Sequence, residues 1–147
     1  MVVGALLLWM GALSVYDVRQ RRLPNWLTLP GGVVILLGGL VTGHCLAALA
    51  GAAALAGMYL LVHLMAPAAL GAGDVKLAVG LGGLTGCFGV AAWLAAALAA
   101  ALLTAGWATA VRVRTGAASV PHGVSLCVGS AGACLPGFFG GAHSWAG

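Results

Sequence analysis

The sequence is almost without acidic residues. It contains no glutamate, and its only side-chain carboxylates are those of Asp17 and Asp74. Six lysines and arginines bring the charged fraction to 5%, whereas a soluble domain commonly has about 25%. A chain of 147 residues with so few charges cannot present a charged surface to water. The composition therefore excludes the soluble classes and indicates that lipid surrounds most of the molecule.

The sequence also lacks the motifs of several enzyme and binding classes. Its four cysteines form no CxxC pair, and it contains no HExxH, no GxSxG and no glycine-rich phosphate loop after a strand. We therefore expect no metal site and no organic cofactor. The basic loops are short and poor in aromatic residues, so nucleic acid is not an expected partner. Their arginines are instead expected to contact anionic lipid headgroups.

Hydrophobic residues make up 63% of the chain and fall into six runs. Because a helix needs roughly 17–25 residues to cross a bilayer, the first run must continue into the Asp17 region. The fourth must likewise borrow residues from the Leu70–Gly73 side. The pattern predicts an all-α, polytopic membrane bundle of about six transmembrane helices, forming a single domain over residues 1–147. The runs are approximately Met1–Tyr16, Trp26–Val41, Leu46–Met65, Lys76–Gly86, Phe88–Val111 and Gly123–Phe139.

The cations predict the orientation of this bundle. With six spans, all six lysines and arginines fall in the first, third and fifth loops or at their edges, and the opposite loops contain none. Lysine and arginine accumulate on the cytoplasmic side of membranes. The pattern therefore predicts a multi-pass protein of the plasma (inner) membrane with both termini outside. The cations are Arg19, Arg21, Arg22, Lys76, Arg112 and Arg114.

The two aspartates are expected at the same depth. Asp17 closes the first span and Asp74 opens the fourth, both on the predicted cytoplasmic side. Two carboxylates held close together do not both ionise readily, so one keeps a proton while the other is charged. The charged member can activate water and the protonated member can hydrogen-bond a scissile carbonyl, which is acid–base peptide hydrolysis. The alternative is that Asp17 only pairs with the nearby arginines and Asp74 only with Lys76.

The residues around Asp74 are small. Gly71 and Gly73 have no Cβ, so an extended substrate backbone could approach them closely. In a chain with 25 glycines, the pattern Gly-x-Gly-Asp alone is weak evidence for a catalytic site. Its predicted position at a membrane edge, opposite a second aspartate, makes it specific.

Two segments, "DVRQRRLPNWLTLP" from Asp17 and "GAGDVKLAVGLGG" from Gly71, resemble the type IV prepilin peptidase family of GxGD intramembrane aspartic proteases. The family has one catalytic aspartate in a D-x-x-x-x-x-[IL]-P-N segment and the second in a G-x-G-D-x-K segment. The resemblance implies that Asp17 and Asp74 are catalytic. It also implies that Gly71, Gly73, Lys76 and Asn25 contact the substrate.

The resemblance further implies the substrate. Family members remove the short basic leader of prepilin-like precursors at the cytoplasmic face of the membrane. The chain has no paired CxxC motifs, so it looks like the minimal, peptidase-only members found with tight-adherence pili. The later "VPHGVSLCVG" segment is similar to the P-x-G segment that starts the last helix in many members, with His122 in place of a common aromatic residue.

Two other functions remain as alternatives. A small ion- or proton-coupled transporter could use the two aspartates as ion sites, although such acids usually lie near the bilayer midplane. The second alternative is an inactive scaffold of a pilus or secretion assembly. The presence of both aspartates argues against it.

Overall fold

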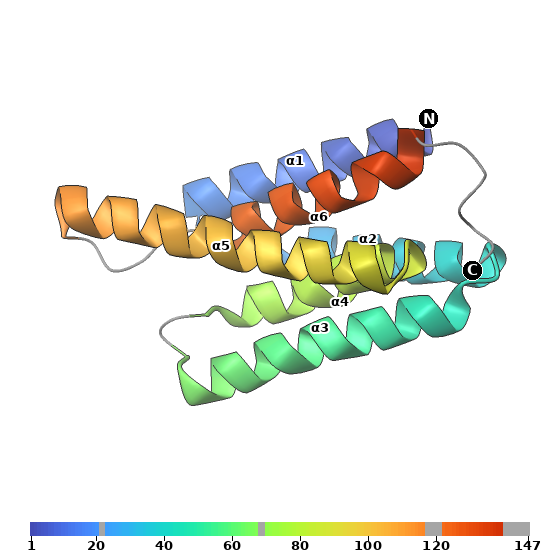
Figure 1. The fold of residues 1–147 in the computed structure, drawn as a ribbon, viewed down its shortest axis with the longest axis horizontal. Helices are drawn as coiled ribbons and strands as arrows, with labels where there is room; N and C mark the ends of the chain where they lie inside the picture. The colour runs from blue at the N-terminus through green and yellow to red at the C-terminus, as the bar shows by residue number, and fades with distance from the viewer. Residues whose placement is uncertain (21–22, 68–69, 117–121, 140–147) are drawn as a thin grey trace.

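The computed structural model describes residues 1–20, 23–67, 70–116 and 122–139. Within these ranges the chain forms six α-helices and no strand, which confirms the predicted all-α bundle (Figure 1). The helices are α1 (Val2–Gln20), α2 (Asn25–Val41), α3 (Cys45–Met65), α4 (Ala72–Cys87), α5 (Val90–Thr115) and α6 (His122–Phe139).

Three helices, α1, α3 and α5, are long and apolar enough to cross a membrane, and α2 is a shorter apolar helix. As the length argument required, α1 continues past Asp17 to Gln20. The fourth hydrophobic run, Lys76–Gly86, likewise extends into the Leu70–Gly73 side, because α4 begins at Ala72. Gly71 is the N-cap of this helix, and Asp74 lies in its first turn.

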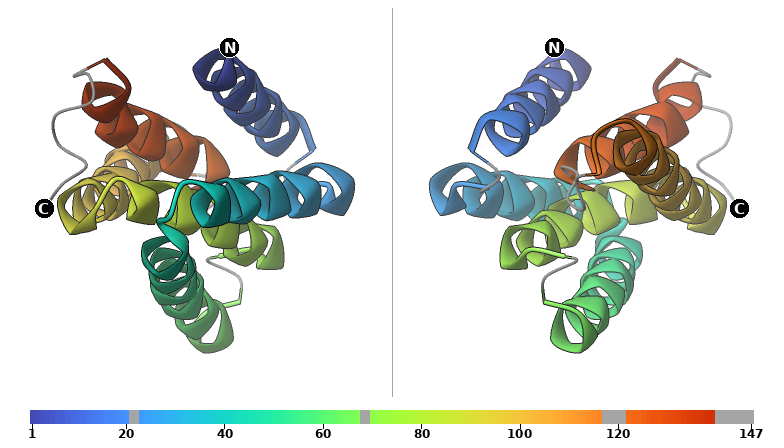
Figure 2. Two further views of the ribbon diagram at one scale, coloured as in Figure 1. Left: turned by 90° about the vertical axis from the view of Figure 1, so that its right-hand side faces the viewer. Right: turned by 90° about the vertical axis from the view of Figure 1, so that its left-hand side faces the viewer.

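The centre of the bundle is α4. It packs against α2, α3, α5 and α6, and every residue from Gly80 to Gly86 is buried (Figure 2). Its contact with α3 is close because both helices present glycine there. A Cβ on Gly82 would lie 2.5 Å from the backbone oxygen of Gly51 and 2.8 Å from Cβ of Leu55. Small residues of this kind let membrane helices approach each other closely.

Helix α1 is attached to the bundle through α6 and α2. This helix packs mainly on α6, and Trp9 joins it to α2. The indole Nε1 of Trp9 donates a hydrogen bond to the backbone oxygen of Leu27 at 2.9 Å. Gly31 is adjacent, and a side chain there would overlap the indole ring. These contacts hold α1 against α2.

Because consecutive helices alternate in direction, the ends of α1, α3 and α5 meet the starts of α2, α4 and α6. We call this the site end of the bundle; it lies to the left in Figure 1. There, α5 extends past its neighbours and carries the exposed residues Arg112 and Arg114. Arg19 and Lys76 are at the same end, while Arg21 and Arg22 lie outside the described residues.

The α3–α4 contact predicts a difference between two glycines. Gly82→Ala places a methyl group against backbone atoms that cannot move aside, so it should lower the free energy of unfolding by about 1–3 kcal/mol. Gly57→Ala is the control, since a Cβ there meets nothing within 4 Å. It should be neutral or stabilising by up to about 1 kcal/mol, because alanine favours helix. Thermal unfolding in detergent compares the two, and equal effects would contradict the packing account.

The distribution of cations predicts the labelling of cysteines by a membrane-impermeant maleimide. In a cysteine-free background, Gln20→Cys at the site end should react only from the cytoplasm. Thr42→Cys, in the exposed turn between α2 and α3, should react only from outside. Labelling of intact cells and inverted vesicles measures both positions. The reverse pattern would overturn the orientation.

Candidate active site

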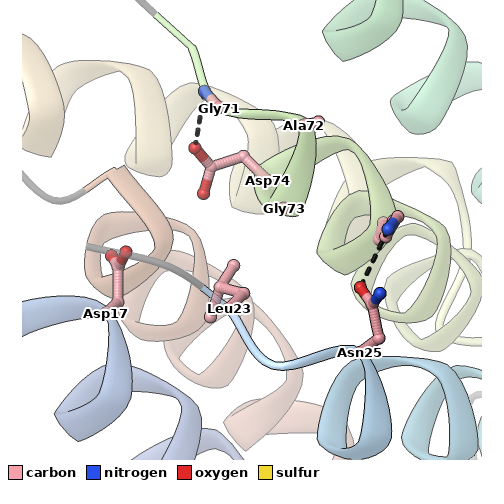
Figure 3. A pocket seen from close by; sticks show the side chains of 8 residues that line it. Asp17, Leu23, Asn25, Gly71, Ala72, Gly73 and Asp74 are labelled. Carbon is pink, nitrogen blue, oxygen red and sulfur yellow. Dashed lines mark hydrogen bonds between the residues drawn. The ribbon is translucent and has the colours of Figure 1, made fainter. Parts of the chain in front are cut away.

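A cavity of about 310 Å³ opens at the site end of the bundle. All six residues singled out from the sequence line it, although they come from three helices and the segments that precede them (Figure 3). Leu23 and Ala72 complete the lining. The six residues are Asp17, Asn25, Gly71, Gly73, Asp74 and Lys76.

Asp17 is held by a helix that lies far from it in the sequence. It belongs to the last turn of α1, and its side chain is only 6% exposed. Its Oδ2 accepts a hydrogen bond from the backbone N–H of Val124 at 3.2 Å. Val124 lies in the first turn of α6, where backbone N–H groups have no partner within the helix. The start of α6 therefore supplies the donor that the buried carboxylate needs.

Asp74 is held by its own helix. It lies in the first turn of α4 with 9% of its surface exposed, and its Oδ2 accepts a hydrogen bond from the backbone N–H of Gly71 at 3.3 Å. An acidic side chain at this position satisfies an N–H at the helix start. The other oxygen, Oδ1, is buried and has no hydrogen-bond partner among the described residues. One carboxylate oxygen is thus used locally, and the second lies close to Gly123 of α6.

Both carboxylates meet the backbone of α6 at Gly123. A Cβ on this residue would lie 2.8 Å from Oδ2 of Asp17 and 3.4 Å from Oδ1 of Asp74. A single methyl group would therefore touch both acids, which places the two carboxylates on one small patch of backbone. Figure 3 shows them directed into the same cavity from α1 and α4. Pro121, which belongs to the P-x-G segment noted in the sequence, lies outside the described residues.

The partner of Lys76 is an amide. Its Nζ donates a hydrogen bond to Oδ1 of Asn25 at 2.8 Å, linking α4 to the start of α2 (Figure 3). The sequence left open an ion pair with Asp74, but the side-chain bond that forms is the one to Asn25. Asn25 and Lys76 thus form a polar pair at the edge of the cavity.

The glycine before Asp74 accommodates a segment of the same chain. A Cβ on Gly73 would lie 3.1 Å from Cβ and 3.4 Å from N of Leu23, and Leu23 is buried. Leu23 lies shortly before α2, so its contact with Gly73 joins the start of α2 to the first turn of α4. The close backbone approach expected at Gly73 is therefore made here by Leu23.

Three partners of the site were not identified from the sequence. Val124 binds Asp17, while Tyr59 on α3 and Thr104 on α5 each form a hydrogen bond with His122 at the start of α6. The contact of Val124 involves only its backbone, which no side-chain pattern reveals. Tyr59 and Thr104 lie in long apolar runs that also contain His63 and Thr109, so nothing in the sequence distinguished them.

The described residues contain no group of three or more histidine, cysteine, aspartate or glutamate side chains placed to bind a metal ion. The chemistry available in the cavity is that of two buried carboxyl groups, one lysine and one amide. Such a set can move protons to and from a water molecule and a substrate.

A profile of the type IV leader peptidase family matches residues 4–109 of this chain. The match includes both aspartates and the whole lining of the cavity, and it ends before α6. Comparisons with curated proteins and with solved structures give no significant match.

The contact of Gly73 with Leu23 predicts different outcomes for two neighbouring glycines. Gly73→Ala should push the Leu23 segment away from α4 and reduce peptidase activity by about tenfold, since small displacements of a reacting group are costly. Gly71→Ala is the matched control, because a Cβ there is 3.5 Å from Oδ2 of Asp74, an ordinary contact. It should keep most of the activity. Rates measured on a leader-bearing precursor in detergent decide this, and a greater loss at Gly71 would contradict the geometry.

Proposed function

The chain belongs to the type IV leader peptidase family and is a peptidase, and on that premise we propose that it is an aspartic endopeptidase with Asp17 and Asp74 as its catalytic pair. We further propose that it removes the basic N-terminal leader of prepilin-like precursors at the cytoplasmic face of the plasma membrane. Residues 1–147 would act as one membrane-embedded domain. The observation that supports this best is that the only two carboxylates, from α1 and α4, line one cavity and lie against one glycine.

In the proposed reaction the two carboxyl groups share one proton. The ionised member accepts a proton from water, and the resulting hydroxide attacks the carbonyl carbon of the scissile peptide bond. The protonated member donates a hydrogen bond to the carbonyl oxygen and stabilises the tetrahedral intermediate. Transfer of a proton to the nitrogen then breaks the C–N bond and releases an amine and a carboxylic acid. The pair acts as a unit, so these roles belong to the dyad and not to either residue separately.

The edge of the cavity suits an extended peptide. Gly71, Ala72 and Gly73 offer little side-chain bulk on one side, while Asn25 and Lys76 offer an amide and an ammonium group on the other. These polar groups can hydrogen-bond peptide carbonyls of a bound segment. We propose that the precursor binds along this edge, with its scissile bond facing the two carboxylates.

The position of the pair disfavours the transporter alternative. A transport path across the membrane usually has its acidic residues near the middle of the bilayer. Here Asp17 lies in the last turn of α1 and Asp74 in the first turn of α4, both at the site end. An inactive scaffold is distinguished from a peptidase only by an activity measurement.

The dyad predicts that Asp17→Asn and Asp74→Asn each abolish leader removal while the protein stays folded in the membrane. The double variant should be no worse than either single variant, because members of one catalytic unit are non-additive. Purified protein in detergent is incubated with a synthetic precursor, and mass spectrometry identifies the products. Gln20→Asn, an exposed change three residues after Asp17, is the control and should retain activity. Substantial cleavage by either single variant would contradict the assignment of Asp17 and Asp74 as the catalytic pair. If the unmutated protein cuts no precursor from its own genome, the scaffold or transporter alternative is favoured.

A further inference from the structure

A cluster of three polar side chains lies beside the aspartates and takes no part in the reaction described above. Oη of Tyr59 and Nε2 of His122 are joined by a hydrogen bond of 2.6 Å. Oγ1 of Thr104 and Nδ1 of His122 are joined by another of 2.6 Å. We call Tyr59, Thr104 and His122 the His122 cluster; it connects α3, α5 and the first residue of α6.

The geometry of the cluster fixes the imidazole. A neutral imidazole has one N–H donor and one nitrogen acceptor, while each hydroxyl can donate or accept. One hydroxyl therefore donates to the ring and the other accepts from it. The Tyr59 ring also lies against the imidazole, with centroids 5.2 Å apart, and Tyr59 is 6% exposed. Both hydrogen bonds are partly buried, so the three polar groups depend on one another and the cluster favours one position of His122.

The residues that follow His122 contact both catalytic acids. Gly123 lies against the carboxylates of Asp17 and Asp74, and the N–H of Val124 is the hydrogen-bond donor to Asp17. Asp17 is on α1, which has few contacts with the central part of the bundle besides those through α6 and Trp9. The location of its carboxylate therefore depends on where the first turn of α6 lies.

We propose that His122 is a positioning residue for the aspartate pair. By bonding Tyr59 on α3 and Thr104 on α5, it fixes the first turn of α6, and that turn in turn holds Asp17 beside Asp74. The inference rests on the proposed peptidase function and adds to it a residue beyond the stretch that matches the family. His122 acts through the backbone of Gly123 and Val124, because both of its ring nitrogens are already engaged by hydroxyl groups.

The first test measures how much each of the two hydrogen bonds of His122 contributes to kcat. His122→Phe keeps an aromatic ring and loses both bonds, and it should lower kcat by about tenfold or more, since displacement of a reacting group by 1 Å is costly. KM should stay within about twofold, because substrate binding at Asn25 and Lys76 is untouched. His122→Gln preserves a polar atom near Nε2 and His122→Asn one near Nδ1, so each should restore part of kcat. A variant that lost stability alone would show no such recovery.

The partners provide the matched controls. Tyr59→Phe and Thr104→Val should each lower kcat, and neither should lower it further when combined with His122→Phe. Thr109→Val is the control on α5, since the Thr109 hydroxyl bonds only within its own helix, to the backbone oxygen of Ala105. It should leave kcat unchanged. If His122→Phe does not fold, the proposal is tested with four other variants: Tyr59→Phe, Thr104→Val, His122→Gln and His122→Asn.

Hydrogen exchange gives a readout that does not depend on the peptidase proposal. In His122→Phe the amides of residues 123–126 should exchange faster, by about tenfold or more, while the centre of α4 is unaffected. If the unmutated protein cuts no precursor, the proposed function fails, and this measurement still decides whether His122 anchors α6. Unchanged kcat in His122→Phe, or unchanged exchange at the start of α6, would overturn the positioning role.

Discussion

Two carboxylates buried inside a helical bundle must be supplied with hydrogen-bond donors, because an unpaired buried acid is costly. Backbone N–H groups are the donors to one oxygen of each carboxylate. The N-cap residue of α4, Gly71, donates to Asp74, and Val124 in the first turn of α6 donates to Asp17. Both donors are helix starts, where N–H groups have no partner within the helix. The starts of α4 and α6 both lie at the site end, where they can supply these donors.

The glycines make that arrangement possible. Gly123 lets the backbone of α6 lie against both acids, and Gly73 lets Leu23 fold onto the start of α4. Further along α4, Gly82 allows contact with the α3 backbone at Gly51. The central helix is consequently held on several sides at once. A rigid α4 gives Asp74 a fixed position, against which α1 and α6 place Asp17.

Much of this fold follows from local sequence features. Hydrophobic runs and the spacing of cations predict the helices and their shared end, and the rarity of acidic residues singles out Asp17 and Asp74. The start of α4 at Ala72 agrees with the length argument, which required the short fourth run to include residues from the Leu70–Gly73 side. The bond from Val124 to Asp17 and the contacts of His122 with Tyr59 and Thr104 could not be predicted. They join residues far apart in the chain, and one of them uses only backbone atoms, so no local pattern encodes them.

The central claim is that the starts of α4 and α6 bring the Asp17 and Asp74 side chains into one cavity. Chemical cross-linking tests it most directly. In a cysteine-free background, Asp17→Cys and Asp74→Cys are combined and treated with a methanethiosulfonate reagent that has a two-carbon spacer. The intact mass of the unfolded, purified protein reports cross-linking, and Gln20→Cys with Asp74→Cys is the control pair. We predict that most molecules with cysteines at 17 and 74 carry one reagent bridging both, and that the control pair does not. Two separately modified cysteines at 17 and 74, or equal bridging in the control, would contradict the account.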